Sequence, residues 1–367
     1  MNSQSSKKPS LPSEARMIEA IKQIGPRNMS KVSSMTNIPV ETVRYKLKRQ
    51  LPKMGFSIHA QPSYGKLGLS VYWATLRFAR QDTQLSARVL NYLGEKGYLV
   101  YYSRELPNGR YSANFALPSG TLNECTSNLD YLVKNKILSD YQLDEVTHVQ
   151  YHSLNPRYFN FRSKRWEVDW SNVKAEEPSQ SRIKATQIVS FDKYDLLLLK
   201  EFQADALQHT TDIARRSKAA TPVLGYHYRT HLQKYGLVDT YMVRWMPEAA
   251  KKKVGQTATT VRIRIADVKQ KELQQVHNGF IRLPFSWTEH FTNRNMFIAT
   301  LVVPVDEMIN IFDYLNGELP QLVDKIDTSF VKSQDVAQFT VPYDMFERNW
   351  NVSYGGLGPE LKKLTQG

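Results

Sequence analysis

The sequence predicts an α+β protein built from two copies of one unit, each a winged helix-turn-helix followed by a ferredoxin-like βαββαβ domain. Three observations predict this fold class. The chain contains a long internal repeat, each copy opens with a helix, turn, helix, glycine and strand pattern, and alternating strand and helix patterns follow. At 367 residues, the chain is long enough for two to four compact units.

The repeat covers most of the chain. Segment 43–56 matches 224–237, segment 129–132 matches 312–315, and segment 166–170 matches 350–354. The shifts are 181 (224 − 43), 183 (312 − 129) and 184 (350 − 166) residues, so the matches keep their order with little drift. This period is far longer than that of solenoid repeats, which indicates duplication of a multi-element unit.

The expected organisation has seven parts. They are a disordered basic tail at 1–12, a winged helix-turn-helix at 13–62, a ferredoxin-like domain at 63–170, a linker at 171–190, a second winged helix-turn-helix at 191–245, a second ferredoxin-like domain at 246–355 and a C-terminal tail at 356–367. The linker is rich in Ser, Lys, Glu and Gln and lacks apolar periodicity, which is typical of a connecting segment.

The first helix-turn-helix follows from apolar spacing. Helical periodicity covers 17–24, a short helix is expected at about 30–35, and a third helix at about 40–51 carries its apolar residues on one face. Gly55 ends that helix, and a strand begins at Phe56. This order is the pattern of a winged helix-turn-helix.

A different pattern follows in each unit. Strands are expected at 69–80, 98–105, 111–117 and about 146–152, with helices at 84–96 and 121–136 between them. In the second unit, 261–265 alternates apolar residues with arginine, as in a half-buried strand, and 296–303 is the third strand. The order βαββαβ is that of a ferredoxin-like domain.

The charge balance favours a polyanionic partner. The net charge is +14, and residues 1–60 hold eleven Lys and Arg against three acids, an excess of +8 (11 − 3). A single cysteine, Cys125, excludes a disulfide framework, and no apolar stretch approaches the ~20 residues that span a bilayer. We therefore expect a cytoplasmic, nucleoid-associated protein that binds double-stranded DNA and does not enter a membrane.

The third helix of the first unit has the layout of a recognition helix. Its outer faces are basic and hydroxylic, suited to base edges and phosphates. The expected DNA-contacting residues are Ser30, Lys31, Thr42, Arg44, Tyr45, Lys46, Lys48, Arg49 and Lys53 in the first unit, and Tyr226, His227, Arg229 and Thr230 in the second. The second set is the weaker candidate because residues 191–245 carry a net charge of only +2, eight basic residues against six acids.

These segments resemble a known family. Residues 41–49, followed by Gly55-Phe56 and by 64–69 leading into a strand, resemble the leucine-responsive regulatory protein/AsnC family, and 158–170 looks like the ending of archaeal relatives. The resemblance implies a transcription regulator whose βαββαβ domains mediate assembly and often bind a small effector such as an amino acid. Because typical members carry one unit per chain, the duplication implies either a homodimer or a pseudo-dimer within one chain.

Two alternatives stay open. One is a DNA-architectural protein with little sequence preference. The other is an enzyme resembling the sirohaem decarboxylases, which have a similar layout and share a His-Asn-Tyr-x-Arg stretch on the second strand. Here that stretch reads Val-Tyr-Tyr-Ser-Arg at 100–104, and no counterpart is evident around 281–291. On this basis the sequence favours a protein that is not an enzyme.

No motif for a catalytic group, cofactor or metal stands out. His227 and His231 have the i, i+4 spacing of two ligands on one helix face, but no third ligand lies nearby in the sequence. The glycines of 355–358 lack the following Lys-Ser/Thr of a phosphate-binding loop. Cys125 is expected to be a small buried residue of an amphipathic helix.

Overall fold

A computed structural model describes residues 11–171, 173, 187–247, 256–351, 360, 361 and 363. The first helix-turn-helix consists of α1 (Ser13–Ile24), α2 (Met29–Thr36) and α3 (Val40–Tyr45), which continues as π-helical turns over Lys46–Gln50. Several expected segments lie wholly or mostly outside the described residues. They are residues 1–10 of the tail at 1–12, most of the linker at 171–190, the glycines of 355–358 and most of the C-terminal tail at 356–367.

The third helix folds as its pattern predicts. Val43, Leu47 and Leu51 are buried in one hydrophobic core with Ile18 and Ile21 of α1. Gly55 then adopts a left-handed conformation with φ of +83°, which ends the helical segment. A Cβ atom on Gly55 would come within 2.4 Å of the carbonyl oxygen of Met246, so glycine also permits this close approach of two backbones.

The second helix-turn-helix repeats the first. It contains α6 (Lys193–Ala204), α7 (Thr210–Ser217) and α8 (Thr221–His227), which continues as π-helical turns over Tyr228–Lys234. Asp192 and Asp195 form a capping box at the start of α6. The two bundles touch each other: the guanidinium of Arg27 lies over the rings of Phe202 and Tyr228, at 4.6 and 4.7 Å from their centroids.

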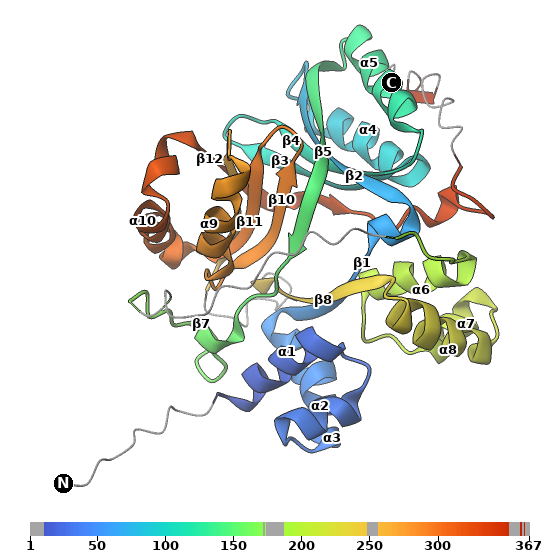
Figure 1. Cartoon of the computed structure of the whole chain (residues 1–367), viewed down its shortest axis with the longest axis vertical. Helices are drawn as coiled ribbons and strands as arrows, with labels where there is room; N and C mark the ends of the chain where they lie inside the picture. The colour runs from blue at the N-terminus through green and yellow to red at the C-terminus, as the bar shows by residue number, and fades with distance from the viewer. Residues whose placement is uncertain are drawn as a thin grey trace.

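The strands after the two helix-turn-helix units pair with each other. Strand β1 (Phe56–Pro62) lies antiparallel to β8 (Val238–Trp245), with Phe56 opposite Trp245 and Ile58 opposite Val243. The two-stranded sheet lies between the helical bundles and the larger sheet (Figure 1). It ties the two copies of the unit together, because each copy contributes one strand.

Each remaining half is a ferredoxin-like βαββαβ domain, as predicted. The first half contains β2 (Leu69–Phe78), α4 (Thr83–Lys96), β3 (Leu99–Leu106), β4 (Tyr111–Pro118), α5 (Leu122–Lys134) and β5 (Leu138–Tyr151). The second contains β9 (Ala258–Ile265), α9 (Gln270–Ile281), β10 (Ser286–Thr292), β11 (Phe297–Pro304), α10 (Met308–Glu318) and β12 (Ile326–Gln338). A short pair, β6 (Phe159–Asn160) and β7 (Arg165–Trp166), lies between the halves in sequence.

The eight long strands close into one barrel. Their order is β10-β11-β9-β12-β3-β4-β2-β5, and β5 pairs with β10 to complete the ring. Strand β12 pairs with β3 at the equivalent position, so the last strand of each half joins the other half. Helices α4 and α5 cover one half of the barrel and α9 and α10 the other (Figure 1). The chain is therefore an intrachain pseudo-dimer.

No described helix combines the length and apolar character needed to cross a membrane.

Two strands differ in length from the prediction. Strand β2 ends two residues earlier than expected. Strand β5 is longer, because Leu138 to Tyr151 pairs along its length first with β2 and then with β10. This extension was not visible from hydrophobic alternation, since the segment is largely polar and half-exposed.

Candidate functional site

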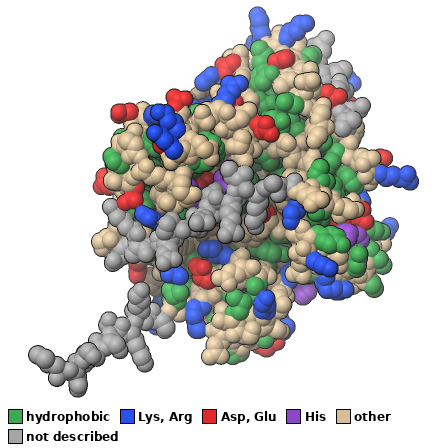
Figure 2. Space-filling model, viewed as in Figure 1, with side chains coloured by type: hydrophobic (Ala, Val, Ile, Leu, Met, Phe, Trp, Pro, Cys, Tyr) green, Lys and Arg blue, Asp and Glu red, His purple; other side chains and the backbone are tan. Residues whose placement is uncertain are grey.

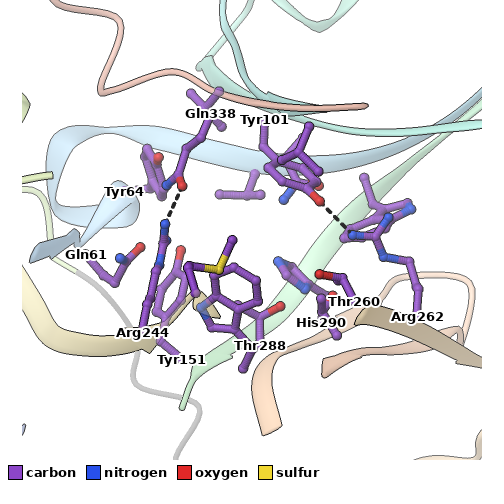
Figure 3. Close-up of a pocket in the computed structure, with 18 residues that line it drawn as sticks. Gln61, Tyr64, Tyr101, Tyr151, Arg244, Thr260, Arg262, Thr288, His290 and Gln338 are labelled. Atoms are coloured by element: carbon purple, nitrogen blue, oxygen red, sulfur yellow. Dashed lines mark hydrogen bonds between the residues drawn. The ribbon is translucent and has the colours of Figure 1, made fainter. Parts of the chain in front are cut away.

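A cavity of about 240 Å³ lies inside the barrel, next to the β1–β8 pair. Its walls come from both halves, and from strands that are distant in sequence (Figure 3). The lining residues are Gln61, Tyr64, Val71, Trp73, Val100, Tyr101, Asn114, Tyr151, Arg244, Met246, Thr260, Arg262, Trp287, Thr288, His290, Thr300, Val336 and Gln338. Half of these residues are apolar or aromatic, and the other half carry amide, hydroxyl, imidazole or guanidinium groups that could orient a ligand.

Arg244 is the cation of this cavity that has no described acidic partner. It comes from β8, and its Nη1 donates a hydrogen bond to the side-chain oxygen of Gln338 at 2.5 Å. Its guanidinium also lies 5.0 Å from the ring centroid of Trp287. Burial lowers the pKa of Arg244 to about 10, so the group remains charged at neutral pH. A partly buried cation bonded to an amide is suited to an anionic ligand.

The second arginine of the cavity is part of an ionic cluster in the barrel core. Arg262 donates to Oε1 of Glu105 at 2.8 Å and to the Tyr101 hydroxyl at 3.0 Å. Arg264 and Arg110 also bond to Glu105, and Asp327 pairs with Arg110. Burial raises the pKa of Glu105, but these arginines outweigh it and hold the pKa far below its usual value. Three arginines against two carboxylates leave an excess of +1 (3 − 2) beside the cavity.

His290 contributes an imidazole to the cavity, and one of its ring nitrogens has no hydrogen-bond partner among the described residues. It lies on β10, is buried, and packs 5.0 Å from the Trp73 ring. Burial and the nearby Arg262 lower its pKa to about 3, so it is neutral. Its Nδ1 is buried without a hydrogen-bond partner among the described residues. An unpaired polar atom inside a cavity is costly unless a ligand or water satisfies it.

Two phenols complete the polar lining. Burial raises the pKa of Tyr64 and Tyr151 well above the usual value, so both hydroxyls are protonated at neutral pH. They lie on the Arg244 side of the cavity (Figure 3). A second hollow of about 350 Å³ adjoins the cavity, because Met246 and Thr260 line both, and Lys332 adds a cation there.

The structure divides the expected DNA-contacting residues into two that face inward and a larger group at or near the surface. Two face inward. Lys46 bonds to Glu14 and to Ser13 of α1, with only 14% of its side chain exposed, and His227 is buried with its Nδ1 2.8 Å from Asp195. Both placements correct the expected outer-face positions, because carboxylates from the first helix of each bundle hold them.

The other expected residues lie on or near the surface. Ser30, Lys31, Arg44, Tyr45, Lys48, Arg49, Lys53, Tyr226 and Arg229 are exposed, and Thr42 and Thr230 are partly buried. Lys48 lies 2.8 Å from His209 of the other bundle, and Arg44 pairs with Glu41. On the face shown in Figure 2, Lys and Arg side chains are scattered among Asp and Glu rather than gathered in one patch. Their contact with DNA remains a prediction.

The comparisons relate the fold to an enzyme. The chain is similar to the crystal structure of the siroheme decarboxylase NirDL, with 9% identity, a TM-score of 0.54 and coverage of 97% of this chain and 100% of that one. The same enzyme in complex with an iron-uroporphyrin III analogue gives 10% identity, a TM-score of 0.53 and coverage of 97% and 99%. No family model and no curated protein matches the sequence.

These similarities confirm the predicted duplicated α+β fold over nearly the whole chain. They also overturn the expectation that the chain is not an enzyme, because the architecture shared end to end is that of a decarboxylase. That expectation rested on a basic helix and on the absence of a short strand motif. Neither feature reports on a cavity that forms between the halves.

Sequence reasoning missed the residues that line this cavity. Arg244, Tyr151 and His290 carry no motif and come from β8, β5 and β10. One signal was available: His290 lies on the strand of the second half that corresponds to β3, where the decarboxylase-type stretch was sought. A second signal was the pair Arg262 and Arg264 in the predicted strand at 261–265. Two arginines on a strand of the barrel require acidic or hydrogen-bonding partners.

Proposed function

We propose that the chain is a decarboxylase that takes a large, planar, carboxylate-bearing substrate of the tetrapyrrole class into the cavity between its halves. The observation that carries this proposal is Arg244, a partly buried cation in the cavity that bonds to Gln338 and to no described carboxylate. Support also comes from the end-to-end fold similarity to siroheme decarboxylase.

The electrostatics favour an anion. Arg244 contributes one uncompensated positive charge, and the cluster around Glu105 contributes an excess of +1 beside it. Charge-assisted hydrogen bonds from arginine to a carboxylate are strong, and Arg can bind both oxygens at once. A carboxylate arm of the substrate would replace Gln338 as the partner of Arg244.

The size of the cavity limits how the substrate lies. At about 240 Å³, the cavity is smaller than the ~300–1,000 Å³ of pockets that enclose a drug-sized ligand. It therefore holds one edge of a macrocycle with its acidic arm. The remainder extends into the adjoining hollow, where Lys332 is available to a second carboxylate.

The chemistry requires orientation, removal of water and one proton. The bond between a methylene carbon and its carboxylate breaks, CO₂ leaves, the electron pair stays on the ring side, and a proton converts the carbon to a methyl group. No oxidant is needed. Arg244 orients the carboxylate, and apolar walls such as Trp73 and Trp287 strip its hydration. The protonated hydroxyls of Tyr64 and Tyr151 are acids within the cavity.

The proposal is tested with the purified full chain and sirohaem under anaerobic conditions. Binding is followed by the shift of the porphyrin absorbance, and turnover by CO₂ release and by product mass. We expect Arg244→Ala to weaken binding by about 1.5–3 kcal/mol, which is ~10- to 150-fold, because a hydrogen bond to a charged group is lost. Arg49→Ala is the matched control, since Arg49 is an exposed arginine of the first helix-turn-helix.

Release of CO₂ by the wild type and by Arg49→Ala, but far less by Arg244→Ala, would support the proposal. Binding of sirohaem without any CO₂ release would contradict the decarboxylase and favour an effector pocket. Failure to bind sirohaem or uroporphyrin would contradict the substrate class.

A further inference from the structure

A second group of residues lies on the outer face of the barrel, under helix α9. His152 follows β5, Glu289 belongs to β10, and His277 belongs to α9. The Nε2 of His152 is 2.9 Å from Oε1 of Glu289, and the Nδ1 of His277 is 2.6 Å from Oε2. One ligand atom from each of the three lies within 4.8 Å of the others. The group is separate from the cavity, because neighbouring residues of a strand face opposite sides.

We propose that His152, His277 and Glu289 form a binding site for a divalent transition metal of the zinc class. The site goes beyond the proposed decarboxylase function and does not depend on it.

The first argument is the unmet bonding capacity of the three side chains. Glu289 and His277 are only 1% and 2% exposed. Oε1 of Glu289, Nε2 of His277 and Nε2 of His152 are buried and lack a hydrogen-bond partner of good geometry among the described residues. Nε2 of His152 and Oε1 of Glu289 lie 2.9 Å apart without good hydrogen-bond geometry, and Nε2 of His277 has no partner among the described residues. Because buried polar atoms are nearly always satisfied, this unmet bonding capacity indicates a missing partner. A cation accepts lone pairs from carboxylate and imidazole together.

The second argument is the donor set. Two imidazoles and one carboxylate are a common set of protein ligands for zinc, with metal distances of about 2.0–2.2 Å. Two ligands of a tetrahedral ion at such distances are about 3.3 Å apart. The 2.9 Å contact between His152 and Glu289 is close to that separation. Harder ions such as Mg²⁺ prefer oxygen ligands and are disfavoured here.

The third argument is access. His152 and its neighbour Ser153 also line a cavity of about 300 Å³ that includes Tyr241 and Arg282. This cavity offers a route to the site and space for a water or an anion as the fourth ligand. Arg282 does not leave an excess charge there, because it pairs with Glu318 at 3.2 Å.

A second triad in the chain provides the internal comparison. Asp195, His227 and His231 also lie within 4.8 Å of one another. There, however, both histidine Nδ1 atoms are 2.8 Å from Asp195 oxygens, and Asp195 further accepts the backbone N–H of Asp192. None of these side-chain atoms is among the buried unsatisfied ones. In the first triad one such hydrogen bond is present, between His277 and Glu289, and the remaining ligand atoms lack one. We therefore assign the second triad as a hydrogen-bonded cap and the first as the metal site.

The test uses the full chain, freed of metal with EDTA and titrated with cobalt(II), whose visible absorbance reports coordination by histidine and carboxylate. Zinc content by elemental analysis gives the stoichiometry. The variants are Glu289→Gln, which preserves shape, and His277→Ala. The matched control is His231→Ala in the second triad. Thermal unfolding checks that each variant is folded. If His277→Ala does not fold, the result for Glu289→Gln decides the test.

We expect one cobalt ion per wild-type chain and at least a ~100-fold loss of affinity in Glu289→Gln and His277→Ala, because loss of an outer-shell partner alone costs 10–100-fold. His231→Ala should bind as the wild type does. The proposal is overturned if the wild type binds no cobalt, if Glu289→Gln binds with wild-type affinity, or if His231→Ala abolishes binding instead.

Discussion

Arg244 donates a hydrogen bond to the side-chain oxygen of Gln338 at one side of the cavity, and the two residues come from two strands of the second unit, β8 and the end of β12. An amide supplies no charge, so the arginine keeps its full positive charge for a ligand. This pairing explains how a chain without a recognisable catalytic motif holds an anion site. It also suggests how the site can be blocked from within.

Replacing Gln338 with glutamate should supply an internal counter-ion for Arg244. We expect Gln338→Glu to weaken binding of a carboxylate-bearing porphyrin at least ~10-fold, since the ligand must displace a charge-assisted bond. Titration of the porphyrin absorbance measures the effect. Gln338→Met, which offers no strong acceptor, should bind as well as the wild type. Equal affinity of the glutamate variant would argue against Arg244 as the anion contact.

The ionic cluster around Glu105 should stabilise the barrel only while the carboxylate and its arginine partners are all present. Glu105→Gln leaves Arg262 and Arg264 buried without their shared carboxylate. We expect a loss of about 3–5 kcal/mol in the free energy of unfolding, the usual cost of breaking a buried pair. Denaturant unfolding provides the measurement. The control is Asp140→Asn, which breaks an exposed pair with Arg77 and should cost under ~1 kcal/mol.

The contact between Glu14 and Lys46 should make the stability of the first bundle depend on pH. Burial raises the pKa of Glu14, but the hydrogen bonds from Lys46, from the backbone and from Ser13, with the charge of Lys46, together outweigh it, and the net pKa is lowered. A lowered carboxyl pKa stabilises the fold above the unfolded value of about 4.5, and this stabilisation is lost as pH falls through the folded pKa.

Glu14→Gln should therefore lower the free energy of unfolding by about 1–3 kcal/mol at pH 7, and the difference from the wild type should shrink towards pH 3. Urea unfolding at a series of pH values measures the difference. A difference that stays constant with pH would show that the carboxylate charge is not what stabilises the bundle.

Asp195 should matter for the stability of the second bundle rather than for DNA. It contacts His227 and His231 and completes the capping box of α6. We expect Asp195→Ala to cost about 1–3 kcal/mol of unfolding free energy. The comparison is Asp212→Ala, which removes an exposed pair with Arg215 and should cost under ~1 kcal/mol. A stable Asp195→Ala variant with reduced duplex affinity would instead restore His227 as a DNA contact.

The amino-acid sequence was sufficient for the order of helices and strands and for the duplication. The stripe of Val43, Leu47 and Leu51 packs into the core as its spacing indicates, and Gly55 ends the helix. Such patterns are local, because the period of apolar residues reports which face of one element is buried. The ferredoxin-like order of each half followed for the same reason.

The tertiary structure alone decided the site. Lys46 turns inward because Glu14, 32 residues away, lies beside it, and Asp195 holds His227 from the same distance. The pairing of β5 with β10 and of β12 with β3 closes the barrel and brings Tyr151, His290 and Gln338 around one cavity. These contacts depend on strands that are far apart in the chain, and no local pattern of residue types encodes which strands will meet.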